Sequence, residues 1–297
     1  PGQVSLVGVH AGVFAVPANG TEPDFRTPQG DSLNAFYNVN SYPSGVINRH
    51  GFTGGAAQGR GSWEGNMAQI LGMTSPVNLG VESSYDAGSQ QLTVHVQLYY
   101  TADSPDGDDH ISVLLTENHI LGWQTDYGPE GNHGNYDHLH VLRTYITGIW
   151  GEAVNTTTTG TWVDRTYTYA VPSTWNVGNC EITAFVGEYQ SDVYQSRTIA
   201  ADGGTTLMTG VLMPEPAPYK GGANAQSSDF TVGMVNALGA DGDYVVTLTQ
   251  TDGRSSWGSA LDVNGSAFTS GSTGAVADDG NAQVVVHITP DAAPGIG

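Results

Sequence analysis

The 297-residue chain is poor in basic residues and in cysteine. Lysine and arginine together number 8, against 29 aspartates and glutamates, which gives a formal charge of -21. Nucleic acids and anionic membrane surfaces are bound by basic patches, so this composition argues against both as partners. The only cysteine, Cys180, excludes a disulfide framework, a Cys-x-x-Cys redox pair and a cysteine-rich zinc site within these residues. It lies in the strand-like run NCEITAFVG, where a buried thiol is expected.

The sequence also lacks a run of 18 apolar residues, so no transmembrane span is predicted. Charged residues make up only 12%, while glycines number 41. Few charges with much glycine, threonine and aromatic content are typical of a secreted β-rich protein. The chain opens on PGQVSLVGVH, which enters a strand-like run almost at once. We therefore expect the first domain to lack residues at its start.

Residues 1–75 alternate between strand and helix patterns. The predicted elements are a buried parallel strand at 4–9, a short helix at 31–37 with Asp31 or Ser32 as its N-cap, a strand at 45–49 and a helix at 62–72 capped by Ser62. Such alternation indicates an α/β layer.

From residue 77 the hydrophobic period changes to two. VNLGVESSYD and QLTVHVQLYYT, joined by AGSQ, predict a hairpin, and further strands follow at a spacing typical of an antiparallel sandwich. The proline-containing stretch at 212–227 has a linker composition. The predicted fold is α+β and mostly β. Its predicted parts are an α/β domain at 1–75, a β-sandwich at 76–211, the linker at 212–227 and an Ig-like β-domain, complete or incomplete, at 228–297.

A tight turn is predicted at Tyr42-Pro43, directly before a short apolar strand. Proline cannot donate a hydrogen bond to a sheet, so it belongs at a strand's entry, at an edge or at a bulge. An aromatic residue before proline is also a setting for a cis peptide bond. An ordinary turn into the strand is the alternative.

Four motifs, in this order, resemble the Omp28-related outer membrane proteins of Bacteroidetes over roughly residues 3–200. They are VSLVGVHAGVFA, SYPSGVINR, NYDHLHVLRTYITGIWGEAV and CEITAFVGEYQSDVYQ. The resemblance implies an exported outer membrane or surface protein with a thioredoxin-like layer before a β-sandwich. Pro43 would then be the cis-proline that faces the redox helix. The strand and Cys-x-x-Cys helix that usually precede it are not in this sequence, so no catalytic cysteine is assigned.

Two clusters of potential metal ligands stand out. Asp103, Asp106, Asp108 and Asp109 form an acidic loop that either wraps calcium or is a solvated turn. The second cluster is HGNYDHLH, with His133, Asp137, His138 and His140. On one face of a strand, His138 and His140 could serve a metal. The resemblance instead makes HLHVLR a packed loop-to-helix corner with structural histidines.

Aromatic residues gather near the long segment 121–154, where they either bind sugars or protein partners or form core. They are Tyr99, Tyr100, Trp123, Tyr127, Tyr136 and Trp150. The sequence contains no Gly-x-Ser-x-Gly elbow.

Since no catalytic residue or cofactor other than calcium is indicated, the first hypothesis is a non-catalytic cell-surface protein. It would act in adhesion or as a structural subunit of an extracellular assembly, with itself or other surface proteins as partners. One alternative is an exported thioredoxin-like thiol-disulfide protein whose redox motif lies upstream of residue 1. The other is a carbohydrate-binding surface protein with glycans as partners.

Overall fold

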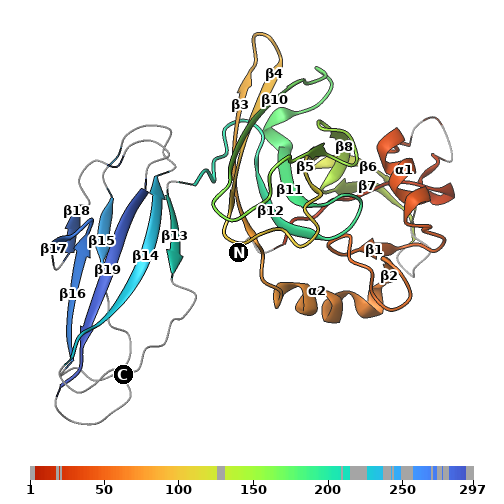
Figure 1. Ribbon diagram of the computed structural model, residues 1–297. Helices are drawn as coiled ribbons and strands as arrows, with labels where there is room; N and C mark the ends of the chain where they lie inside the picture. Colours follow the sequence, from red (N-terminus) through yellow and green to blue (C-terminus); the bar gives the residue numbers. More distant parts are fainter. Residues whose placement is uncertain are drawn as a thin grey trace. The chain divides into compact units, whose positions relative to one another are not determined.

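The computed structural model describes residues 4–17, 20, 22–125, 131–208, 210–214, 226–236, 242, 244–248, 257–268, 270–272, 276 and 281–291. The chain divides into two compact units, Pro1–Leu207 and Met208–Gly297 (Figure 1). Antiparallel strands dominate the described residues and helices are few. The fold is therefore α+β and mostly β, as the sequence predicted.

Two antiparallel sheets form the sandwich of the first unit, with orders β10-β4-β3 and β12-β11-β5-β8. The strands are β3 (Val77–Asp86), β4 (Gln91–Tyr100), β5 (Asp109–Glu117), β8 (Val141–Tyr145), β9 (Glu152–Ala153, paired with β5), β10 (Trp162–Ala170), β11 (Cys180–Glu188, preceded by the 3-10 turn η3, Val177–Asn179) and β12 (Val193–Ala200). The predicted hairpin is confirmed, because β3 and β4 pair from Val77↔Tyr100 to Asp86↔Gln91.

The β12-β11-β5-β8 sheet is covered on both faces. Val113 and Leu115 of β5 pack in the sandwich core, whereas Leu114 between them packs with Leu33 and Phe185 in a second cluster. This split follows from strand geometry, since successive side chains point to opposite faces. The sheet is thus a middle layer, with the N-terminal α/β segment on its outer face (Figure 1).

The α/β segment contains η1 (Val13–Ala15), α1 (Pro28–Phe36), β1 (Ser44–Val46), β2 (Ala57–Gly59), η2 (Arg60–Ser62) and α2 (Trp63–Leu71). The prediction that Asp31 or Ser32 caps the first helix is wrong. Thr27 is the N-cap, and its hydroxyl accepts a hydrogen bond from the Gly30 N–H at 2.9 Å. Pro28 follows at the first helical position, where its missing N–H has no cost and its fixed φ suits a helix. The second helix begins after Ser62 as expected, although the Ser62 side chain makes no capping bond.

The prediction of a buried strand at 4–9 is also wrong. Gly8 forms an isolated parallel bridge with Val141, but Val4 and Leu6 are 49% and 56% exposed. The run borders an open groove, described below, and is not covered on both faces by the described residues.

HLHVLR is not a loop-to-helix corner, because it joins two strands. The long segment contains β6 (Ile120–Gln124) and β7 (His133–His138), which pair with each other, and β8 begins at Val141. His140 between them has a φ of 54°. Its backbone N–H is held by the Asn118 side-chain oxygen at 2.7 Å, which fixes this tight connection.

The second unit contains a five-stranded antiparallel sheet of order β13-β14-β19-β16-β17 and the separate pair β15-β18. The strands are β13 (Gly210–Pro214), β14 (Ser228–Asn236), β15 (Val245–Thr247), β16 (Gly258–Val263), β17 (Ser266–Phe268), β18 (Ser270–Ser272) and β19 (Asn281–Thr289). Met234, Leu261 and Val284 are central in its core. The expected linker at 212–227 begins inside β13, and residues 215–225 lie outside the described residues.

One imidazole bridges three neighbouring strands of this sheet. His287 lies 2.6 Å through Nδ1 from Asp229 and 2.7 Å through Nε2 from Asp262. The hydrogen bond to Asp229 raises the pKa of His287 most, and the hydrogen bond to Asp262 raises it further. Both ring nitrogens can donate only when the ring is protonated, so the arrangement favours the imidazolium.

The second unit is therefore expected to lose stability as the pH rises above about 6.5. Because the pKa of His287 is higher in the folded than in the unfolded state, its full stabilising contribution is present below the unfolded-state pKa. Deprotonation removes this contribution as the pH rises through the folded-state pKa. Thermal unfolding of the full chain between pH 6 and 9 would measure this, and His287→Gln should flatten the profile of the second unit. An unchanged slope in the variant would contradict the assignment.

Candidate functional site

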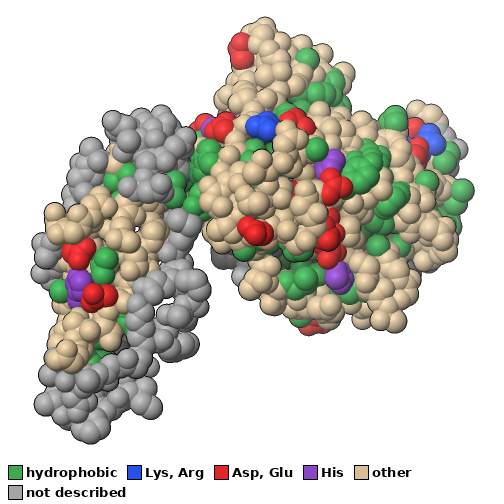
Figure 2. All heavy atoms as spheres, in the orientation of Figure 1, with side chains coloured by type: hydrophobic (Ala, Val, Ile, Leu, Met, Phe, Trp, Pro, Cys, Tyr) green, Lys and Arg blue, Asp and Glu red, His purple; other side chains and the backbone are tan. Residues whose placement is uncertain are grey.

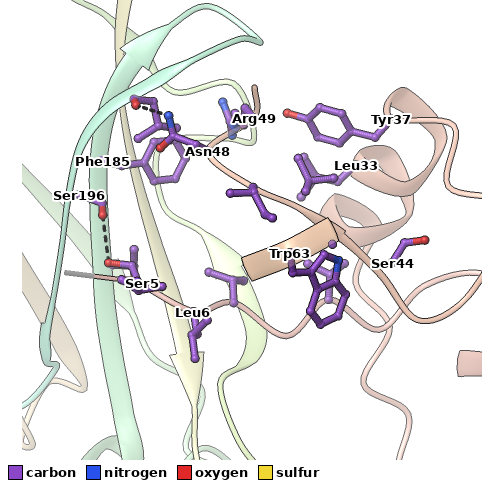
Figure 3. A pocket seen from close by; sticks show the side chains of 18 of the residues that line it. Ser5, Leu6, Leu33, Tyr37, Ser44, Asn48, Arg49, Trp63, Phe185 and Ser196 are labelled. Carbon is purple, nitrogen blue, oxygen red and sulfur yellow. Dashed lines mark hydrogen bonds between the residues drawn. The ribbon is translucent and has the colours of Figure 1, made fainter. Parts of the chain in front are cut away.

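An apolar groove of ≈ 610 Å³ opens between the N-terminal segment and the rest of the α/β layer, above the middle sheet (Figure 3). Residues 4–9 form one border, and residues 44–49, from β1 into the following turn, form another. Helix α2 lines the groove through Trp63, Met67, Ile70 and Leu71. The floor includes Leu114, Phe185 and Val193 of the middle sheet.

Trp63, Met67, Ile70 and Leu71 recur at the helical spacing typical of a core-facing stripe, yet no residue of this helix is buried. Leu71 is 51% exposed, and Leu6 on the opposite border is similarly open. These side chains have the pattern of core residues, but no described residue covers them. The groove is therefore an uncovered part of what the sequence encodes as hydrophobic interior.

Two consecutive residues after β1 attach this border to the sandwich, and both have positive φ: Asn48 at 56° and Arg49 at 55°. The Asn48 side-chain amide donates to the Val193 carbonyl at 2.6 Å, and the Val193 N–H donates to the Asn48 carbonyl at 3.0 Å. The Arg49 guanidinium lies 4.7 Å from the Phe185 ring centroid and donates to the Ile149 carbonyl at 2.9 Å. The sequence analysis did not predict this anchor. The only signal was that two polar residues, Asn48 and Arg49, end an apolar strand.

Few polar groups face the groove. Ser5 Oγ and Ser196 Oγ are 3.2 Å apart, and the Tyr42 hydroxyl donates to the Asn34 side-chain oxygen at 2.7 Å. The Tyr37 hydroxyl is buried without a hydrogen-bond partner among the described residues, and burial raises the pKa of Tyr37 to about 12. The Tyr42–Pro43 peptide bond is cis, at the turn where the sequence placed it.

Among the residues that the structure describes, the lining includes no histidine, cysteine, aspartate or glutamate, and Arg49 is the one charged side chain. General acid-base or nucleophilic chemistry requires such groups within hydrogen-bond reach of a substrate. Cys180 lies in the sandwich core, where burial raises the pKa of its thiol to about 12. The groove thus has the chemistry of a binding surface.

The four aspartates of the acidic loop have separate partners. Asp103 accepts hydrogen bonds from the backbone and hydroxyl of Thr159, and Asp108 lies 3.3 Å from His110. Asp109 is fully buried and accepts from the Tyr100 and Ser104 hydroxyls. Asp106 interacts instead with Glu188. The pKa of the Glu188 carboxyl is raised mainly by burial, and Asp106 raises it further.

Among the described residues, no group of three or more His, Cys, Asp or Glu side chains is placed to hold a metal ion. Calcium binding at residues 103–109 stays a prediction from the sequence. It would be supported if calcium raised the melting temperature and Asp106→Asn abolished that shift.

The histidine cluster is not brought together. His140 Nδ1 lies 3.2 Å from Glu181, and Asp137 is 3.0 Å from His119. His138 points the other way, into a ring cluster with Phe25 (4.7 Å) and His10 (5.8 Å). His10 Nδ1 has no partner among the described residues.

This ring cluster is expected to make the first unit acid-sensitive. Burial lowers the pKa of His10, with a further contribution from His138, and burial also lowers the pKa of His138. The neutral rings stabilise the fold at pH values above about 6.5, and that stability is lost as the pH falls through this value towards the folded-state pKa. Hydrogen exchange of the β6–β7 amides should accelerate between pH 7.5 and 5.5, after correction for the intrinsic rate. His138→Phe, which keeps an aromatic ring but leaves His10 in place, should reduce the change, and an equal change in this variant would contradict the prediction.

The predicted aromatic surface is divided. Tyr99 and Tyr100 are buried, whereas Trp123 and Tyr136 are 38% and 46% exposed. Tyr127 lies outside the described residues. Carbohydrate binding at the exposed pair stays a prediction that a glycan array would test.

The first unit is a β-sandwich whose outer face carries an α/β layer with an open apolar groove among the described residues. The chain belongs to the Omp28 family: the family model described as "Outer membrane protein Omp28" matches residues 30–202. This confirms the resemblance seen in the sequence and shows an exported protein of the outer membrane. Among the described residues, no helix has the length and apolar character needed to cross a membrane.

Two solved structures from Porphyromonas gingivalis are similar to the chain. One is a crystal structure of a domain of the outer membrane lipoprotein Omp28, with 25% identity and a TM-score of 0.30, covering 43% of this chain and 89% of that one. The other is HBP35, with 12% identity and a TM-score of 0.47, covering 88% of this chain and 76% of that one. No curated protein sequence matches the chain.

Proposed function

We propose that the protein is a non-catalytic component of the cell surface that acts in adhesion or as a structural subunit of an extracellular assembly. Membership of an outer membrane protein family supports the location. The observation that carries the proposal is the apolar groove, which exposes core-type side chains; its described lining holds no acid-base or nucleophilic group apart from ordinary hydroxyls. An exposed apolar surface of this kind favours association with another polypeptide.

The test is the assembly state of protein purified from cells, by light scattering and electron imaging of the same sample. Oligomers or fibres are expected, and Leu6→Asp or Leu71→Asp should disperse them. Both side chains are more than half exposed, so the substitutions should not prevent folding. Leu121→Asp is a matched control, since Leu121 is 68% exposed and lies outside the groove. Monomers at all concentrations, with no bound partner, would contradict the proposal.

A second candidate is an exported thiol-disulfide protein whose redox motif lies upstream of residue 1. The observation in its favour is that residues 4–9 and β1 border the same open groove, which is where the resembled fold would place a preceding strand and helix of the same chain. Mass spectrometry of the mature protein distinguishes the two candidates. A Cys-x-x-Cys segment ahead of Pro1 that reduces insulin disulfides would support the thiol-disulfide reading.

A further inference from the structure

We propose that the free edge of β10, in the sandwich, pairs with the β10 edge of a second copy of this chain. The two strands would run antiparallel about a two-fold axis at Thr168, which joins their sheets into one continuous sheet. The inference rests on the proposed structural role and names the partner as the protein itself.

Every second backbone group of β10 points away from its neighbour β4. Two hydrogen bonds flank the β10–β4 ladder: the Tyr100 N–H donates to the Thr161 carbonyl at 3.0 Å, and the Val171 N–H donates to the Gln90 carbonyl at 2.9 Å. In an antiparallel ladder alternate residues bond to the neighbouring strand. The odd-numbered residues of β10 therefore face β4 with their backbone groups, and the even-numbered ones face outwards.

Thr166, Thr168 and Ala170 are the outward-facing residues in the second half of β10. Their backbone groups have no partner strand among the described residues, because β10 is the outermost strand of its sheet. The opposite edge, β3, is covered by the chain itself, since the Ser83 N–H donates to the Gly204 carbonyl at 2.9 Å. β10 also contains no proline, lysine or bulge, which are common devices against edge pairing.

Both ends of this open stretch are blocked, and the blocked ends match in a self-pair. At one end the Asp164 carbonyl accepts a hydrogen bond from the Arg165 guanidinium at 2.8 Å. At the other end Pro172 has no N–H to donate. With Thr168 on the axis, Asp164 of one copy lies opposite Pro172 of the other, so pairing stops there in both directions. A register centred on Thr166 would instead place the occupied Asp164 carbonyl inside the pair.

The side chains fit the same register. Thr168 meets its own copy on one face of the sheet, and on the other face Tyr167 lies opposite Tyr169 of the second copy. Cross-strand aromatic pairs stabilise a sheet, whereas like charges directly opposite each other destabilise it. Asp164 and Arg165 lie outside the paired stretch, and a register centred on either would place like charges face to face.

Long-range repulsion opposes the pair, and this gives it a distinctive salt dependence. The protein has a formal charge of -21, and acidic side chains outnumber basic ones on the face seen in Figure 2. Residues 166–170 themselves carry no charge. Salt screens the repulsion between the two copies, so added salt should tighten the dimer. An interface held by ion pairs would weaken instead.

The test is sedimentation equilibrium of the full chain, combined with residue-resolved hydrogen exchange. Dimers are expected as the protein concentration rises, with slower exchange at the amides of Thr166, Thr168 and Ala170. The amides of Arg165 and Tyr167 should exchange slowly at every concentration, because they already bond to β4. This alternation identifies strand pairing, since docking through side chains would not produce it.

Charge reversal at the axis tests the register. Thr168→Lys should weaken dimerisation about fivefold or more, because like charges then face each other. Thr168→Glu should do the same, and a mixture of the two variants should associate again. The Thr168 side chain is exposed, so neither change should prevent folding. Ser84→Lys is the matched control, exposed on β3 of the same sheet, and should change dimerisation less than about twofold.

Three results would overturn the inference. The first is a monomer at every concentration, and the second is dimerisation that Thr168→Lys leaves unchanged. The third is slow exchange of the outward amides in the isolated monomer, which would show that another segment of the same chain already pairs with β10. Assemblies that Leu6→Asp disperses and Thr168→Lys does not would refute the strand pair alone. A cell-derived protein without any partner would refute the proposed function as well.

Discussion

Replacing Arg143 by methionine is expected to destabilise the first unit by about 3–5 kcal/mol. The Arg143 guanidinium contacts Glu117 through Nε at 2.8 Å and Nη2 at 2.7 Å, and the Glu117 side chain is only 6% exposed. The other carboxylate oxygen of Glu117 accepts the Asn176 N–H at 3.0 Å. Removing the arginine leaves a buried negative charge without its partner. Denaturant unfolding, with hydrogen exchange to report the first unit separately, would measure the loss.

A double variant distinguishes the cost of the unpaired charge from general damage. Glu117→Leu combined with Arg143→Leu should recover much of the loss, because an apolar pair has no desolvation penalty. Arg165→Met is the exposed control: its contact with Glu152 is 3.1 Å, with side chains 37% and 47% exposed, so the change should stay below about 1 kcal/mol. Equal effects of Arg143→Met and Arg165→Met would show that burial does not set the cost.

Leu114→Ala is expected to destabilise the first unit by about 2–5 kcal/mol. Leu114 is fully buried on the outer face of the middle sheet, where it packs with Leu33 of the α/β layer and forms part of the groove floor. Because residues up to 207 form one compact unit, we expect the α/β layer and the sandwich to unfold in a single transition in both wild type and variant.

Leu139→Ala is the matched control, since Leu139 is 48% exposed and its loss should cost no more than about 0.5 kcal/mol. A variant that loses only the α/β layer, while exchange in β3 and β4 stays slow, would mean that the layer and the sandwich are separate cooperative units. That outcome would match the boundary near residue 75 that composition and periodicity suggest.

The β3–β4 hairpin shows where the sequence pattern was sufficient. The alternating runs in β3 and β4 encode both the hairpin and its register, because a shift of one residue would expose the whole apolar face. The α2 spacing likewise gave a helix with nearly the right bounds. Residues 4–9 form an apolar run, but the sequence could not predict whether this run is buried. Its burial depends on which distant segments pack against it.

By itself the sequence determined a mostly β, acidic, exported protein with an α/β layer before its sandwiches, because period, charge and composition are local properties. The tertiary structure alone decided that His138 and His140 diverge, that Asp109 is buried beneath Tyr100, and that the apolar residues of 4–9 and α2 border one uncovered groove. These outcomes depend on which distant segments meet. A hydrophobic pattern indicates that a side chain is suited to burial, but only the packed fold shows whether another segment covers that side chain.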